Sequence, residues 1–186
     1  CVLELGGKSA AIVHADADLD AFETDIRWGI YFNAGQVCSA MSRIIVHESR
    51  HDELIDRAVS VARSLSVGPG IDRPEAGATM GAMVSEAQRD RATGMVTRAE
   101  GQGARVATGG RKLNRAGAFL EPTVLSGVTP DMEIAQHEVF GPVLSVLSFR
   151  TEAEAIDIAN GTDYGLVAGV FTSDLGRATH AARHLR

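Results

Sequence analysis

The feature that most constrains the fold is an alternation of short apolar runs with longer segments of helical periodicity. The apolar runs lack the alternation of apolar and polar residues seen in a half-exposed strand, so they predict strands that are covered on both faces. These runs are residues 10–14, 44–46, 106–108, 123–125, 143–149 and 166–172. Segments with helical spacing lie between them, at residues 18–31, 49–65, 85–101 and 151–160 and from 173 to the last residue. Strands and helices in this order are joined by right-handed crossovers. The sequence therefore predicts an α/β fold with a mostly parallel sheet covered by helices on both faces.

Local signals mark where these elements begin and end. Asp18 or Asp16 is suited to cap the first helix. Ser85 and Thr151 each open a capping box, in which a small hydroxyl residue is followed three positions later by Gln or Glu. Residues 68–81 are rich in Gly and Pro and predict a loop.

The length and net charge of the chain limit the classes of protein to which it can belong. A chain of 186 residues suits one domain, and its net charge of −6, with no cluster of Lys or Arg, argues against nucleic acid or an anionic membrane as partner. No apolar run approaches the ~20 residues of a membrane-spanning helix. Two cysteines make no disulfide framework and fit a reducing compartment, so we expect a cytoplasmic protein. The six histidines show no metal-ligand spacing, and no metal is expected.

Cys38 is the sharpest candidate for chemistry. It follows the small-residue segment 32–37, where a helical pattern breaks. A thiol in such a turn can lie near backbone amides that favour the thiolate, the form in which cysteine acts as a nucleophile. Taken alone, the spacing is also compatible with a cysteine packed as a small apolar residue.

Two glutamates complete the candidate site. Glu4 stands between Leu3 and Leu5 ahead of two glycines, and burial there would make its carboxylate a stronger general base; a solvent-facing Glu at a strand end is the equal alternative. Glu138 lies two residues before Phe140, ahead of the strongest predicted strand. An acid and an aromatic ring there can hold a ribose hydroxyl and cover a ring, although an ordinary loop carboxylate has the same pattern.

Four motifs, taken together and in order, resemble the aldehyde dehydrogenase superfamily. Residues 3–9 resemble its glutamate motif and residues 32–38 its cysteine motif, with the 34-residue separation that the family shows (38 − 4 = 34). Residues 138–142 resemble a third signature. Ala159 and Asn160 with residues 164–166 resemble a fourth. The likeness covers essentially the whole chain.

The resemblance implies a mechanism and a set of site residues. Cys38 would attack an aldehyde to form a thiohemiacetal, its own N–H would serve in the oxyanion hole, and hydride loss to a nicotinamide would leave a thioester. Glu4 would activate water for hydrolysis. Glu138 would bind the nicotinamide ribose and Phe140 would lie by the nicotinamide. Leu5 and Gly6 would also line the cofactor site.

The resemblance also implies that the chain is a fragment. Residues 1–5 would be a linker strand at the end of a preceding domain, and residues 6–186 the catalytic domain. The missing nucleotide-binding domain would hold most of the NAD or NADP, so the fragment is expected to be inactive alone. The full-length protein is expected to form a homo-oligomer, a dimer or tetramer, that acts on a small-molecule aldehyde.

Three alternatives remain open at this point. An enzyme of the same fold that transfers the acyl group to coenzyme A would depend less on Glu4. A catalytically silent structural or assembly fragment would carry the same motifs by inheritance. A cysteine hydrolase without nicotinamide would need a histidine partner for Cys38, and no motif places one.

Overall fold

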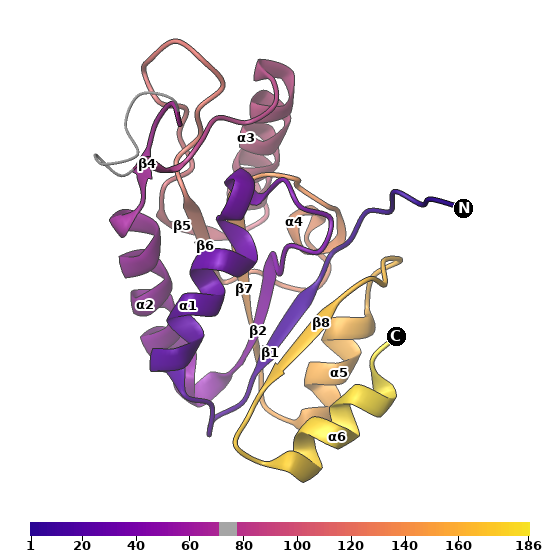
Figure 1. Cartoon of the computed structure of the whole chain (residues 1–186). Coiled ribbons are helices and arrows are strands. Elements are labelled where there is room, and N and C mark those ends of the chain that lie inside the picture. Colours follow the sequence, from indigo (N-terminus) through magenta and orange to yellow (C-terminus); the bar gives the residue numbers. More distant parts are fainter. Residues whose placement is uncertain (71–77) are drawn as a thin grey trace.

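The structure, a computed structural model, describes residues 1–70 and 78–186 and is built on a six-stranded sheet (Figure 1). The strands are ordered β5-β6-β7-β2-β1-β8, and they comprise β1 (Ala10–Val13), β2 (Arg43–His47), β5 (Arg105–Thr108), β6 (Thr123–Ser126), β7 (Val143–Phe149) and β8 (Ala168–Phe171). All neighbours pair in parallel except β5 and β6, which are antiparallel. The predicted α/β fold with a mostly parallel sheet is confirmed.

Helices cover both faces of the sheet. They are α1 (Leu19–Ile30), α2 (His51–Ser64), α3 (Glu86–Gly101), α4 (Glu133–Gln136), α5 (Glu152–Asn160) and α6 (Leu175–His184), with short 3-10 helices η1 (Phe32–Gly35) and η2 (Glu48–Arg50). Figure 1 shows α1 and α2 packed together on one side of the central strands, and α5 and α6 on the other. The four residues of β1 are all buried, as expected for a strand covered on both faces.

The first helix shows how the sequence pattern becomes structure. The side chain of Asp18 accepts hydrogen bonds from the N–H groups of Asp20 and Ala21, which caps the helix. One face of α1 is then buried on the sheet: Leu19, Phe22, Ile26 and Ile30. The ring of Phe22 meets that of Phe171 on β8 edge to face, with centroids 4.4 Å apart.

Three local predictions are wrong or incomplete. The last helix ends at His184 and does not continue to the last residue. The Asn160 side chain accepts the N–H of Arg186 and donates to the carbonyl of His184, and Leu185 between them has an extended backbone. The short helix α4 was not predicted. Part of the predicted loop 68–81 forms β4 (Ala78–Met80), which pairs with β3 (Ser66–Val67), while its residues 71–77 lie outside the described part.

The amino end of the chain differs most from expectation. Residues 1–9 have no regular secondary structure, so the strand expected within residues 1–5 is not formed, and residues 1–6 are exposed in a segment that projects from the sheet (Figure 1). Among the described helices, none combines the length and apolarity needed to cross a membrane.

The parallel register fixes where the chain enters the central strands. Because β7, β2 and β1 are neighbours in parallel, the segments that precede them converge at one edge of the sheet. These segments carry Gly7, Cys38 and Glu138. The candidate site therefore lies at the amino ends of the strands, opposite to the carboxyl-end crevice where open α/β sheets usually bind ligands.

Candidate active site

Cys38 lies in an exposed turn held by an unusual backbone conformation. Immediately upstream, three consecutive residues have left-handed backbone angles: Asn33 (φ 50°), Ala34 (φ 55°) and Gly35 (φ 71°). Residues other than glycine pay about 1–2 kcal/mol for this conformation, so the surrounding structure must enforce it. Cys38 is exposed, so it does not act as a buried packing residue.

Gln36 fixes this turn through both ends of its side chain. Its Nε2 donates to the carbonyl of Asn33, and Asn33 Nδ2 donates back to the carbonyl of Gln36, each at 3.0 Å. Its Oε1 accepts the N–H of Val84 at 2.7 Å. The turn is thus tied to itself and to the segment that precedes α3.

The cysteine turn is pressed against the two other segments of the site. A Cβ atom placed on Gly35 would lie 2.1 Å from the carbonyl oxygen of Gly141, and one on Gly7 would lie 2.4 Å from the carbonyl oxygen of Cys38. Real Cβ atoms do not approach backbone oxygens so closely, so both positions require glycine at these contacts.

Glu138 meets the amino-terminal segment at the same place. Its Oε1 accepts the N–H of Gly7 at 3.2 Å, and a Cβ on Gly6 would lie 2.6 Å from its Oε2. Gly7 is therefore explained by the close approach of backbone, whereas the group near Gly6 is the end of a flexible side chain. Neither has a left-handed φ.

Two side chains of α3 hold the segment that contains Glu138 and Phe140. Gln88 Nε2 donates to the carbonyls of Val139 and Phe140, both at 3.0 Å. Arg91 donates to the carbonyls of Val139 and Glu138 at 3.1 and 3.0 Å. Phe140 has a left-handed φ of 53° and remains 36% exposed.

Sequence reasoning missed Gln88 and Arg91 as site residues. Both are polar residues of a helix whose exposed face is polar, and nothing in their spacing points to a loop some 50 positions away. In the predicted capping box, Ser85 Oγ accepts the N–H of Gln88, but the Gln88 side chain binds the carbonyls of Val139 and Phe140 and not the start of the helix.

The structure does not bring Glu4 and Leu5 into the site with Cys38 and Glu138. Both are exposed in the projecting segment, and the Leu5 side chain is 56% exposed. The burial expected to strengthen Glu4 as a base is absent. Of the predicted residues, Cys38, Gly6, Glu138 and Phe140 lie on the converging segments.

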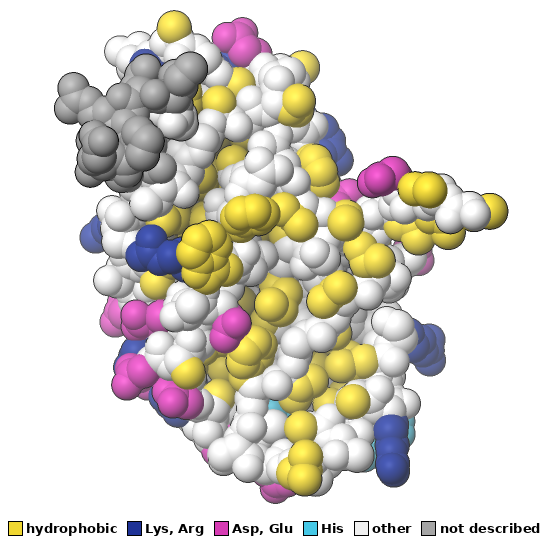
Figure 2. Space-filling view, viewed as in Figure 1, with side chains coloured by type: hydrophobic (Ala, Val, Ile, Leu, Met, Phe, Trp, Pro, Cys, Tyr) yellow, Lys and Arg dark blue, Asp and Glu magenta, His cyan; other side chains and the backbone are white. Residues whose placement is uncertain are grey.

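An apolar cavity of about 310 Å³ lies beside the 3-10 helix that leads to Cys38. Its lining includes Trp28, Tyr31 and Phe32. The rings of Trp28 and Phe32 are more than half exposed, with centroids 6.1 Å apart, whereas Tyr31 is buried and donates from its hydroxyl to the carbonyl of Thr123. Burial raises the pKa of Tyr31 above its usual range. Figure 2 shows hydrophobic side chains spread across the face that includes α1, β1 and β8.

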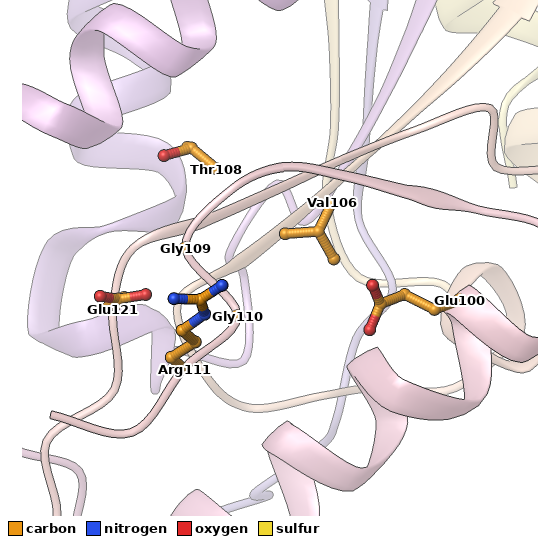
Figure 3. A pocket seen from close by; sticks show the side chains of 7 residues that line it. All are labelled: Glu100, Val106, Thr108, Gly109, Gly110, Arg111 and Glu121. Atoms are coloured by element: carbon orange, nitrogen blue, oxygen red, sulfur yellow. The ribbon is translucent and has the colours of Figure 1, made fainter.

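A second cavity, of about 420 Å³, lies away from the site at the outer strand β5. Figure 3 shows Glu100 at the end of α3 across the cavity from Arg111 and Glu121. None of the predicted site residues lines it, and its charged side chains carry both signs. We therefore assign the candidate site to the converging segments and not to this cavity.

Comparison with known proteins shows the family of the chain. Residues 1–186 match the sequence model of the aldehyde dehydrogenase family. An aldehyde dehydrogenase of Alternaria alternata is 46% identical over 99% of the chain, and peroxisomal aminoaldehyde dehydrogenase 1 of Pisum sativum is 43% identical over 99%. A solved aldehyde dehydrogenase of Bacillus cereus in complex with NAD⁺ superposes with a TM-score of 0.93 at 40% identity over 98% of the chain.

The chain spans about a third of the length of these relatives, 36% in each of the three. The match nevertheless extends over all 186 residues. The chain therefore belongs to the aldehyde dehydrogenase family.

Proposed function

We propose that this chain is the catalytic region, residues 6–186, of an enzyme that oxidises an aldehyde to a carboxylic acid with NAD or NADP as hydride acceptor. Residues 1–5 would link it to a preceding nucleotide-binding domain. The observation that carries the proposal is the packing of the Cys38 turn against Gly7, which itself binds Glu138. The NAD⁺ complex of the Bacillus cereus relative favours NAD.

Cys38 is proposed as the nucleophile. Its thiol would add to the aldehyde carbon, forming a C–S bond and a thiohemiacetal whose oxygen carries the developing negative charge. Within the described residues, no hydrogen-bond acceptor takes the N–H of Cys38, which leaves this donor for the oxyanion. The rigid turn would keep thiol and N–H in fixed relation, as pre-organised charge stabilisation requires.

Glu138 and Phe140 are proposed to hold the nicotinamide end of the cofactor. The carboxylate of Glu138 is anchored at one oxygen by a backbone N–H, which leaves acceptor capacity for ribose hydroxyls. The partly exposed ring of Phe140, on a strained backbone held by Gln88, would pack by the nicotinamide. When bound, the nicotinamide accepts the hydride that converts the thiohemiacetal to a thioester.

Glu4 is proposed as the base that activates water to hydrolyse the thioester. It lies three residues before Gly7, and three residues of extended chain span about 10 Å. A change of direction near Gly6 would therefore suffice to bring the carboxylate over the thiol. Leu5 and Gly6 would then face the cofactor.

The apolar cavity beside Trp28 and Phe32 is proposed to receive the aldehyde's side chain. Its aromatic lining favours an apolar substituent over a charged one. We further propose a cytoplasmic homo-oligomer, a dimer or tetramer, for the full-length protein. The chain alone would be inactive in aldehyde oxidation, since the cofactor would be held mainly by the preceding domain.

Acyl transfer from p-nitrophenyl acetate tests the nucleophile without cofactor. The thiolate would attack the ester carbonyl, expel p-nitrophenolate and leave an acetyl thioester 42 Da heavier on Cys38. Peptide mass spectrometry should find the adduct on Cys38 and much less on Cys1, which is also exposed. The Glu4→Gln variant should acylate at the same rate but lose the acetyl group more slowly. Equal labelling of both cysteines would contradict the assignment of Cys38.

A further inference from the structure

Lys8 is a buried cation in an unusual position. It directly follows Gly7 at the entrance to β1 and is only 2% exposed. Within the described part of the chain, its Nζ has no hydrogen-bond partner. Lysine is almost never buried without a partner, because desolvation penalises its charged form.

The charged groups around Lys8 come from three elements. Arg43 of β2 donates to the carbonyl of Lys8 at 2.9 Å, and its two other guanidinium nitrogens donate to the carbonyls of Ile158 and Ala159. Arg91 of α3 adds a second positive charge, and Glu138 supplies the negative one. Burial first, and then the charge of Arg43, lower the pKa of Lys8 to about 7, although Glu138 acts in the opposite direction.

Lys8 is coupled to Glu138 through its own neighbour in the chain. The Glu138 carboxylate binds the N–H of Gly7, so the contact and the buried amine belong to adjacent residues. A protonated amine attracts the carboxylate toward this segment, and a neutral amine does not.

A small cavity borders the segment that contains Lys8. It measures about 20 Å³, is lined by Lys8, Ser9 and Arg43 among others, and borders Asn160 and Tyr164. Ser9 Oγ, like Lys8 Nζ, is buried without a partner among the described residues. A polar space of this size has room for one water molecule.

We propose that Lys8 is a positioning residue that, with its proton, fixes the Glu138 carboxylate at the Gly7 amide and, without it, releases the carboxylate. This rests on the proposed role of Glu138 in cofactor binding, and it makes the cofactor side of the site pH-dependent.

The sequence allows a direct test, since Lys8 and Lys112 are the only lysines. With lysine labelled by ¹³C and ¹⁵N, NMR follows both side chains from pH 5 to 11, and Lys112, partly exposed and paired with Asp90 at 2.7 Å, is the internal reference. We expect the Lys8 signal to titrate with a midpoint near 7. The Gly7 amide should change chemical shift with the same midpoint.

Two variants separate the parts of the proposal. Lys8→Met should abolish the step of the Gly7 amide near neutral pH. Glu138→Gln, a change at a partly buried side chain whose amide oxygen can still accept the Gly7 N–H, should move the Lys8 midpoint to lower pH, because it removes the attractive charge. A Lys8 midpoint unchanged by Glu138→Gln, or a Gly7 amide without a step between pH 6 and 8, would overturn the proposal. No aldehyde, cofactor or turnover enters this test, so its failure is distinct from failure of the proposed function.

Discussion

Gly7 touches the carbonyl of Cys38 so closely that no side chain fits between them. A Cβ atom on Gly7 would lie 2.4 Å from that oxygen and 3.5 Å from Cβ of Leu166. Two segments separated by 30 residues in the sequence are thus in backbone contact at the candidate nucleophile. This contact links the glutamate motif to the cysteine motif and explains why the second glycine belongs to the site.

Gly7→Ala should therefore destabilise the protein. The added methyl group meets backbone rather than a flexible side chain, and overpacking of this kind costs about 1–3 kcal/mol of the free energy of unfolding. Urea denaturation measures the loss. Gly101→Ala is the matched control, because nothing lies within 4 Å of its Cβ position, and it should change stability by less than about 1 kcal/mol. Equal effects of the two substitutions would show that the Gly7 contact is not tight in solution.

Arg91 should stabilise the segment that carries Glu138. Arg91→Met removes two hydrogen bonds from a charged donor to the carbonyls of Glu138 and Val139, and should lower the free energy of unfolding by about 2 kcal/mol. Hydrogen exchange of amides 138–141 should accelerate as well. Arg63→Met serves as control, since among the residues that the structure describes its guanidinium makes only a long 3.4 Å contact with Thr108 Oγ1, and it should cost less than about 0.5 kcal/mol. Unchanged exchange in Arg91→Met would argue against this anchoring role.

His14 should make the fold sensitive to acid. It is buried after β1 with its ring edge-on to Phe149 and no partner for Nε2 among the described residues. Burial, and next the charge of Arg177, lower its pKa from 6.5, while Glu152 and Asp16 act in the opposite direction and His47 lowers it further. The unfolded chain therefore binds a proton at higher pH than the folded chain does. Stability from the neutral ring is complete above pH 6.5 and is lost progressively as the pH falls from there toward the folded-state pKa.

Urea denaturation at a series of pH values checks this dependence. His14→Gln should flatten the fall in stability below pH 6.5, whereas His180→Gln, on an exposed part of α6, should leave it unchanged. A slope unaffected by His14→Gln would assign the acid sensitivity to other groups.

The chain alone should produce no measurable NADH from an aldehyde and NAD. The residues proposed to touch the cofactor are few, and the projecting segment that carries Glu4 is exposed. Absorbance at 340 nm with an excess of both substrates measures the rate. Brisk NADH formation would contradict the proposal that the cofactor is held mainly by a preceding domain.

Much of the fold was readable from the sequence because the strands are apolar throughout and the helices carry clear caps. Asp18, Ser85 and Thr151 each bind backbone N–H groups at the expected helix starts. The end of α6 was not readable, because it depends on the distant Asn160 side chain. The same holds for α4, a single turn too short to show a helical period.

The candidate site was readable in its residue types but not in its contacts. Motif spacing pointed to Cys38 and Glu138, yet it gave no sign of the three left-handed residues before Cys38 or of Gln88 and Arg91 behind Glu138. Those features arise from tertiary packing between segments far apart in the sequence. The exposure of Glu4 likewise depends on what surrounds residues 1–6, which local apolarity does not determine.

The most direct test of the account is the rate at which iodoacetamide alkylates Cys38 near neutral pH. Peptide mapping follows Cys38 in the folded chain and, as reference, the same residue after unfolding in urea. If Cys38 is a nucleophile shaped by its turn, folding should speed its alkylation at least about tenfold over an ordinary thiol. A rate in the folded chain equal to or below that of the unfolded chain would contradict the central claim.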